Sequence, residues 1–372
     1  MRSISNVSSD AAELVARDDT HWDALFRDPK GRVVDPVTVY GAPIADTHCH
    51  LDMLPHPELS IARAAYHGIR FLVTVVDPTE NPEYTYENID AWLARANELL
   101  VEWRSTVSES ESTTAASESV AASVTETGAT LPEPTAASDN AVPTLAVAKT
   151  DAMPTELADA IKLPELRVII GCHPHNASKF DDEGLSTVIK WLDHPRTAAI
   201  GEIGLDYHYD ASPREVQREA FRRQLALANE RGWPVALHLR DAHEDGYEIL
   251  CEQGWPEAGV LLHCYTLGPQ EVKPFLEKGA HVALGGTMTF NNAWMLREAV
   301  YQIPVERLMT ETDSPFMTPM PLRGTLCGPE HTLFTAAALA ENRGVHGEAA
   351  VRELLQRVYQ NGVEFFSHQA SI

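Results

Sequence analysis

Eight short runs rich in β-branched and other apolar residues recur along this sequence, and segments of helical character separate them. The apolar runs occupy 44–48, 71–76, 168–173, 198–204, 235–240, 259–264, 281–285 and 308–313. The helical segments occupy 58–67, 82–103, 183–192, 213–231, 243–253, 269–278, 291–302, 331–342 and 347–366. Strands that alternate with helices form parallel βα units, and eight such units predict an α/β fold of the closed (β/α)8, or TIM-barrel, type.

One stretch, residues 105–150, interrupts this alternation. It consists largely of Ser, Thr, Ala, Glu and Pro, contains no aromatic residue and carries a single basic side chain, Lys149. Such a composition buries too little apolar surface to offset the entropy lost on ordering, so we predict a disordered insertion; an Ala-rich helix is the alternative. The predicted domains are an N-terminal extension at 1–41, able to add a short helix or strand, and a single barrel domain at 42–372 that contains the insertion.

Charge and cysteine content restrict the partners and the compartment. The formal net charge of −25 opposes diffuse attraction to phosphates, so we expect no extended nucleic-acid-binding surface. The five cysteines are odd in number and show no Cys-x-x-Cys spacing, which suits a reducing cytosol better than a disulfide framework. Neither a signal peptide nor a membrane-spanning apolar run is present, so the sequence predicts a cytoplasmic monomer without membrane contact.

Side chains that bind divalent metal ions follow five of the eight runs. They are His48, His50, Glu202, His238, His263 and Asp313. The C-terminal ends of the strands meet at one mouth of such a barrel, where reacting groups are found. His48 and His50 also point the same way, because alternate side chains of a strand share a face. Four imidazoles and two carboxylates at one mouth suit two divalent cations, and a carboxylate is able to bridge them.

The motifs that contain these residues resemble those of the TatD-like metal-dependent hydrolases, a family of the amidohydrolase superfamily. The similarity covers Asp46-Thr47-His48-Cys49-His50-Leu51-Asp52, Gly171-Cys172-His173-Pro174-His175, Gly201-Glu202-Ile203-Gly204-Leu205-Asp206-Tyr207, Leu237-His238-Leu239-Arg240, His263-Cys264-Tyr265, Thr289-Phe290 and Glu311-Thr312-Asp313-Ser314-Pro315. It spans essentially the whole barrel but neither 1–41 nor 105–150. Two positions depart from the family: Tyr265 stands where Phe is usual, and 323–330 lacks the usual Asn-Glu-Pro.

The resemblance implies a Mg-dependent deoxyribonuclease with two metal ions, in a family whose sites often contain zinc. It implies that one ion is held by His48, His50, Glu202 and Asp313, and the other by Glu202, His238 and His263. Many relatives bridge their metals with a carbamylated lysine, but this chain has no Lys between Lys190 and Lys273, which leaves Glu202 as the bridge. The ligand types themselves leave the metal open between Mg, Zn and Mn.

The chemistry follows from the metal. A divalent ion lowers the pKa of a bound water from near 16 to about 7 and so supplies hydroxide at neutral pH. Asp313 can take the proton of that water as general base. The resemblance implies that His173 approaches the substrate phosphate. Arg240 either neutralises charge on the substrate or forms a structural salt bridge, while Asp206 and Glu311 are expected to orient histidines or loops.

Two functions fit this site. The first is phosphodiester hydrolysis by metal-activated hydroxide, as in a TatD-like DNase, with DNA as the substrate. The alternative is hydrolysis of a small ester, lactone or amide, which the same hydroxide could attack and which the acidic surface favours slightly. A barrel that only binds a partner would leave the ligand set unused, and the fold alone does not choose among these functions.

Overall fold

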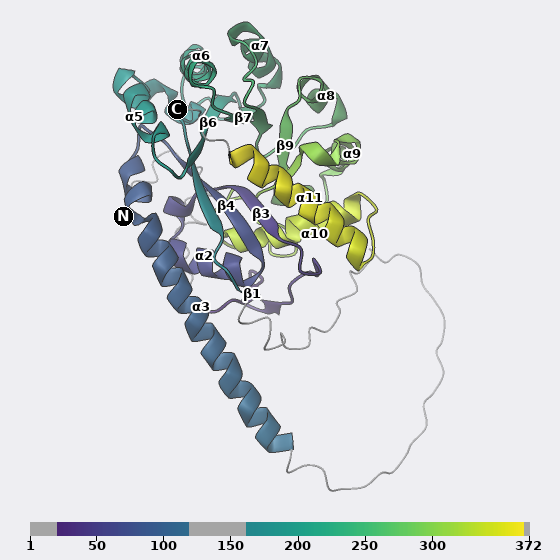
Figure 1. The fold of residues 1–372 in the computed structure, drawn as a ribbon. Coiled ribbons are helices and arrows are strands. Elements are labelled where there is room, and N and C mark those ends of the chain that lie inside the picture. Colours follow the sequence, from purple (N-terminus) through teal and green to yellow (C-terminus); the bar gives the residue numbers. More distant parts are fainter. Residues whose placement is uncertain (1–20, 119–160, 368–372) are drawn as a thin grey trace.

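The computed structural model describes residues 21–118 and 161–367 (Figure 1). Eight strands form one sheet in which hydrogen-bonded neighbours follow chain order and run parallel. They are β3 (Ile44–Cys49), β4 (Ile69–Val76), β5 (Glu165–Ile170), β6 (Thr197–Asp206), β7 (Val235–Arg240), β8 (Val260–Leu262), β9 (His281–Leu284) and β10 (Leu308–Thr310). Each of the eight predicted strands is therefore present, close to its predicted bounds.

Contacts between the first and last strands close the sheet into a barrel. The Thr310 hydroxyl of β10 donates to the carbonyl of Ala45 at 2.8 Å, and the Thr47 hydroxyl of β3 donates to the carbonyl of Thr310 at 3.1 Å. Just beyond the strands, the backbone N–H of Asp313 donates to the carbonyl of His48 at 2.9 Å. The predicted (β/α)8 barrel is confirmed, and its closure brings the end of β10 beside the histidines of β3.

Helices surround the barrel (Figure 1). They are α2 (Pro57–Tyr66), α3 (Pro82–Glu118), α5 (Asp182–Leu192), α6 (Arg214–Arg231), α7 (His243–Gln253), α8 (Pro269–Glu277), α9 (Trp294–Gln302), α10 (Thr332–Asn342) and α11 (Glu348–Phe366), with short 3₁₀ turns η1 (Leu51–Met53), η2 (Pro174–Lys179), η3 (Gly286–Thr289), η4 (Val305–Arg307) and η5 (Pro329–His331). The carboxylate of Asp181 caps α5, and Gly232 ends α6 in the left-handed region at φ 68°. Among the described residues, no helix has the length and apolar character needed to cross a membrane.

Apolar side chains fill the barrel interior and close one of its ends. The interior cluster includes Phe71 and Ala236, both fully buried, together with Phe365 and Phe366 from the end of α11. The ring of Phe366 lies 6.5 Å from the ring of Phe71, near the start of β4. Helix α11 therefore covers the N-terminal ends of the strands, and the polar site is left to the C-terminal ends.

Helix α3 is longer than its predicted range. The composition of 105–150 predicts disorder from residue 105, yet the helix that begins at Pro82 continues to Glu118 and extends well beyond the barrel (Figure 1). Residues 105–118 contain neither Pro nor Gly, and extending a formed helix costs much less than nucleating one. The disorder prediction is therefore wrong for 105–118, and the rest of the insertion, 119–150, lies outside the described residues.

Residues 104 and 161, which flank the stretch replaced in the test below, contact each other, so this stretch can be removed without separating its ends. The Arg104 guanidinium donates to the carbonyl of Ile161 at 2.9 Å. The connection from α3 to β5 follows a helix and precedes a strand, so it belongs to the N-terminal end of the barrel, opposite the mouth that holds the predicted site. We expect that replacing 106–160 by a short Gly/Ser linker changes kcat/KM less than about twofold and leaves the barrel folded. Steady-state kinetics and thermal unfolding measure both; a tenfold loss in kcat/KM would place this segment at the mouth.

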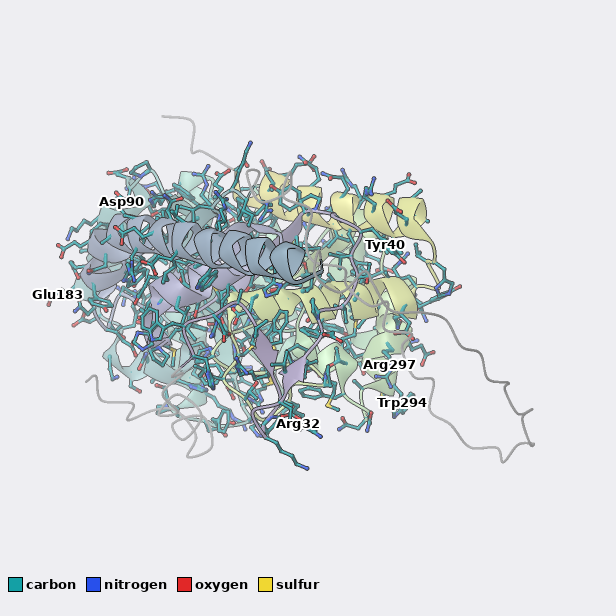
Figure 2. All side chains as sticks on the ribbon, turned by 90° about the horizontal axis from the view of Figure 1, so that it is seen from below. Arg32, Tyr40, Asp90, Glu183, Trp294 and Arg297 are labelled. Carbon is teal, nitrogen blue, oxygen red and sulfur yellow. The ribbon has the colours of Figure 1, made fainter. Side chains whose placement is uncertain are left out.

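The N-terminal arm adds two short antiparallel strands, β1 (Phe26–Arg27) and β2 (Val33–Val34). Phe26 is buried, and its ring centroid lies 4.3 Å from that of His67 and 4.9 Å from that of Phe334. Arg32, between the two strands, projects into solvent (Figure 2). The predicted arm thus contributes strands rather than a helix in its described part, and it packs against the ends of α2 and α10.

Candidate metal centre

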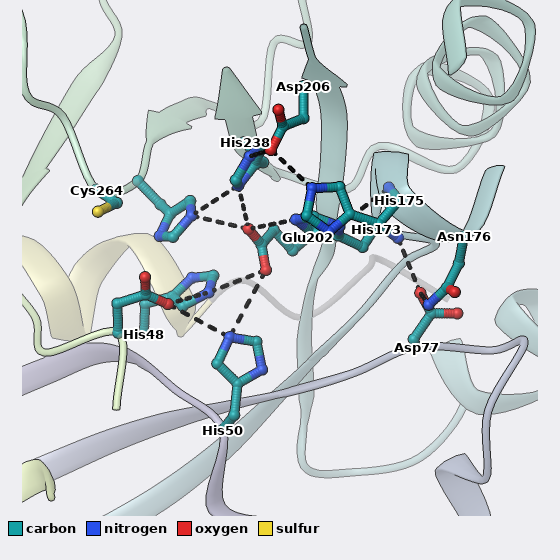
Figure 3. A network of polar contacts seen from close by, with 12 residues as sticks. His48, His50, Asp77, His173, His175, Asn176, Glu202, Asp206, His238 and Cys264 are labelled. Atoms are coloured by element: carbon teal, nitrogen blue, oxygen red, sulfur yellow. Dashed lines mark hydrogen bonds and ion pairs between the residues drawn. The ribbon is translucent and has the colours of Figure 1, made fainter. Parts of the chain in front are cut away.

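The predicted metal-binding residues converge around Glu202 of β6, at the C-terminal mouth of the barrel (Figure 3). Its Oε1 lies 2.7 Å from Nδ1 of His238 and 2.8 Å from Nε2 of His263. Its Oε2 lies 3.3 Å from Nε2 of His48 and 3.8 Å from Nε2 of His50. The fold thus brings four histidines, carried by three different βα units, to one buried carboxylate.

Asp313 joins the group that faces Oε2. Its Oδ1 lies 3.4 Å from Nε2 of His50 and 4.0 Å from Nε2 of His48. The donor atoms of His48, His50 and Asp313 all lie within 4.8 Å of one another, as do those of His48, Glu202 and His263. The two oxygens of Glu202 therefore face different groups of donors, which is the arrangement that a carboxylate shared by two cations requires.

His173 lies nearer to this cluster than a purely substrate-binding role would require. Its Nε2 is 3.4 Å from Oε1 of Glu202, and with Glu202 and His238 it forms a third group of donors within 4.8 Å of one another. The backbone N–H of His173 donates to the carboxylate of Asp77 at 3.0 Å, which fixes this loop. The predicted contact of His173 with substrate stays a prediction, and the geometry also allows it to bind a metal ion.

The burial of His48 tests whether metal ions fit here. Its side chain is fully buried, and neither ring nitrogen forms a hydrogen bond of good geometry among the described residues, although Nε2 lies 3.3 Å from Oε2 of Glu202. The imidazole stacks on that of His263 with ring centroids 3.7 Å apart. Burial, aided by the charge of His263, lowers the pKa of His48 and so keeps the ring neutral. A buried imidazole that lacks a well-formed hydrogen bond is costly, and the neutral form is the one that binds a divalent cation, so these residues fit a metal.

Both carboxylates of the cluster are ionised at neutral pH. Burial opposes the charge on Glu202, but the facing His263, His173 and His48 hold the pKa of this carboxyl well below its usual range. Burial likewise opposes the charge on Asp313, and the hydrogen bond from His50 with the charge of His263 keeps its pKa lowered. A buried anion, Glu202, and a partly buried one, Asp313, lie among imidazoles and provide the charge that divalent cations would balance.

Residues 45–367 match the family model of the TatD related DNases, a range that covers nearly all of the barrel domain and excludes the whole N-terminal arm. The chain belongs to the TatD family. The metal-dependent hydrolase YabD of Bacillus subtilis is 41% identical over 172 residues, which make up 46% of this chain and 68% of that protein. This TatD-family chain is accordingly a metal-dependent hydrolase.

Other TatD relatives carry more specific names. The 3′-5′ ssDNA/RNA exonuclease TatD of Pantoea vagans is 39% identical over 155 residues, which are 41% of this chain and 59% of that protein. The human 3′-5′ RNA nuclease TATDN2 is 34% identical over 198 residues, 51% of this chain but only 26% of that protein. The crystal structure of the Escherichia coli TatD homologue YJJV superposes with a TM-score of 0.63 at 22% identity, covering 89% of this chain and 100% of that one. This last comparison confirms the fold.

The two departures from the usual TatD pattern lie outside the donor cluster. Tyr265 is buried, and its hydroxyl donates to the carbonyl of Gly268 at 2.6 Å, so the extra oxygen is satisfied locally. The segment 323–330 packs beside the arm, where Leu326 and Cys327 line a cavity together with Phe26. The unusual segment 323–330 thus borders a cavity beside the arm, and it contains none of the predicted metal ligands.

Two acidic side chains, Asp206 and Glu311, contact ring nitrogens of histidines in this TatD centre. Oδ2 of the buried Asp206 lies 3.2 Å from Nε2 of His238 and 2.7 Å from Nε2 of His175. Glu311 is buried too, with Oε1 3.5 Å from Nδ1 of His263. Both positions agree with the orienting role expected for them. The part of His175 was not predicted, although the spacing His173-Pro174-His175 after the third strand was a signal for it.

Arg240 lies outside the donor cluster, at the end of β7 and two residues beyond His238. Within the described residues its guanidinium forms neither an ion pair nor a side-chain hydrogen bond, so the structural salt bridge offered as its alternative role is absent there. Its nearest ring is that of Tyr209, whose centroid is 4.7 Å from Cζ. No carboxylate among the described residues neutralises this charge, and contact of Arg240 with the substrate stays a prediction.

Proposed function

We propose that this TatD-family hydrolase is a divalent-metal-dependent nuclease that removes nucleotides from the 3′ end of single-stranded DNA. The observation that carries the proposal is Glu202, whose two oxygens face two groups of histidines at the barrel mouth. Two cations held in this way suit phosphodiester hydrolysis, because both the attacking and the leaving oxygen gain charge stabilisation. The 3′-5′ nuclease names of the P. vagans and human relatives support the direction, and the ssDNA/RNA exonuclease name of the P. vagans relative supports the single-stranded DNA substrate.

The residues divide into roles. Glu202 would be shared by two ions of Mg, Mn or Zn; His48, His50 and Asp313 would hold one of them, and His238 and His263 would hold the other. When bound, such ions lower the pKa of water and offset the charge of the phosphate. Asp313, whose side chain is 14% exposed, accepts the proton of the attacking water as general base. The neighbouring His173 donates a hydrogen bond to a phosphate oxygen and so helps to position it.

A shallow salt dependence is expected for DNA binding. The net charge of −25 leaves no long basic track, so the enzyme contacts only the few phosphates near the metals. Each phosphate neutralised on a single strand contributes about −0.7 to the slope of log K against log salt, so we expect a slope of magnitude about 3 or less. Fluorescence anisotropy across a salt series measures it. A slope of magnitude about 7 or more would mean an extended phosphate-binding surface.

The competing function is hydrolysis of a small ester, lactone or amide, which the acidic exterior favours over DNA. The deciding experiment compares a labelled single-stranded oligonucleotide with a panel of esters, lactones and amides, each with and without added Mg, Mn or Zn. We expect the oligonucleotide to be shortened from its 3′ end only when metal is present. Metal-dependent turnover of a lactone or ester alongside intact DNA would replace the nuclease by the alternative.

We also propose that the enzyme is a cytoplasmic monomer. Cys49, Cys172, Cys251, Cys264 and Cys327 are all free thiols, as expected of a reducing compartment. Light scattering on the purified protein, which should give a single 41.0 kDa species, tests the oligomeric state. Imaging of the tagged protein in cells tests the compartment.

A further inference from the structure

Tyr209 is an exposed aromatic residue at the rim of the barrel mouth. It follows β6, three residues after Asp206, and 47% of its surface is accessible to solvent. Its ring meets the imidazole of His175 edge to face, with centroids 5.5 Å apart and planes at 90°. The ring centroid of His175 in turn lies 4.4 Å from that of His173, whose Nε2 is 3.4 Å from Oε1 of Glu202. A short chain of ring contacts therefore connects this exposed tyrosine to the metal centre.

One carboxylate positions both the tyrosine and the centre. Oδ1 of Asp206 accepts hydrogen bonds from the backbone N–H groups of His208 and Tyr209, each at 2.9 Å. Its Oδ2 meets the imidazoles of His175 and His238. The turn that carries Tyr209 is thus tied to the same buried group that orients a proposed metal ligand, and the ring sits at a defined place beside the site.

Arg240 supplies the complementary charge. It lies on β7 two residues after His238, and therefore points from the same face of the strand. Its guanidinium is stacked over Tyr209, 4.7 Å from the ring centroid, and among the described residues it has no carboxylate partner. In a chain of net charge −25, this arginine is a local positive charge that lies against an exposed aromatic ring.

We propose that Tyr209 and Arg240 form a subsite for the nucleotide next to the bond that is cleaved, with its base stacked on Tyr209 and its phosphate beside Arg240. The subsite rests on the nuclease function and narrows its substrate to strands with an unpaired, unstacked base at this position. Base–aromatic stacking tolerates any base, because every base has a π face. A flat guanidinium can stack and bind phosphate at once, which an ammonium cannot do equally well.

The experiment measures binding of a single-stranded oligonucleotide whose last linkages are phosphorothioates, by fluorescence anisotropy with metal present. We expect Tyr209→Ala to weaken binding about tenfold and Tyr209→Phe to keep most of the affinity, because the phenyl ring still stacks. Tyr301→Ala, which removes a ring that is 68% exposed near the end of α9, is the matched control. Arg240→Lys should weaken binding although it keeps the charge.

A base-free substrate separates stacking from general damage to the site. An oligonucleotide with abasic residues at its 3′ end should bind wild type and Tyr209→Ala equally. Equal affinity of both proteins for the ordinary oligonucleotide would overturn the subsite even if DNA is degraded, and so would the same loss on abasic DNA. If Tyr209→Ala binds ordinary DNA more weakly while wild type cleaves only esters, Tyr209 and Arg240 do bind a nucleotide, but the nuclease function fails and no cleaved bond lies beside that nucleotide.

Discussion

Replacing Glu202 by glutamine is expected to lower kcat by about a thousandfold or more, since losing even a group behind a metal ligand typically costs ten- to a hundredfold. Glu202 has a larger part than such a group, because its two oxygens lie within 4 Å of His48, His50, His238 and His263. Glutamine keeps the size of the side chain but loses its charge and one acceptor. The amide would also leave four imidazoles without their central anion, so binding of both ions should weaken.

Two measurements separate this effect from misfolding. Metal analysis by plasma mass spectrometry should show fewer ions per chain in Glu202→Gln than in wild type, while circular dichroism shows the same helical content. Glu252→Gln is the matched control, because Glu252 is exposed on α7 and pairs with Arg222 at 3.1 Å, away from the donor cluster. Wild-type activity that persists in strong chelator, or a Glu202→Gln variant with normal rate and metal content, would refute the role assigned to Glu202.

The barrel and its donor set were predictable because both leave local signals in the sequence. Parallel strands buried on both sides are short apolar runs, and the helices between them show their own periodicity. The topology then places every strand end at one mouth, so His238 and His263 could be expected near His48 without any knowledge of distances. Closure between β3 and β10 completes the group by bringing Asp313 to His50, at 3.4 Å.

The surroundings of the donors were not predictable in the same way, because they depend on side-chain contacts between distant segments. His175 reaches Asp206 across 31 positions of sequence. Tyr209 owes its place to the second oxygen of that carboxylate and to Arg240 from the next strand. No spacing rule announces such a convergence. The extension of α3 past residue 105 was not predicted for another reason. Composition alone takes no account of the helix that is already formed before this residue.

Asp313→Asn is expected to separate proton transfer from metal binding. Asp313 adopts φ 60°, in the left-handed region, which Asn tolerates well and Ala does not. Asparagine keeps an oxygen that can bind a cation, but it cannot accept the proton of the attacking water. We therefore expect kcat to fall by about a hundredfold to ten-thousandfold, the usual contribution of a general base, with metal content close to that of wild type.

Asp313→Ala provides the comparison, because it removes the oxygen and also strains the backbone. It should lose metal as well as activity, and its thermal stability should fall below that of the asparagine variant. Single-turnover kinetics at saturating metal, with ion content measured on the same samples, distinguish the two variants. If Asp313→Asn keeps more than about a tenth of the wild-type rate, the loss is smaller than the removal of a general base would cause. Asp313 would then only hold metal, and another group would take the proton. His173 would then be the first residue to test in its place, since its Nε2 lies 3.4 Å from Glu202.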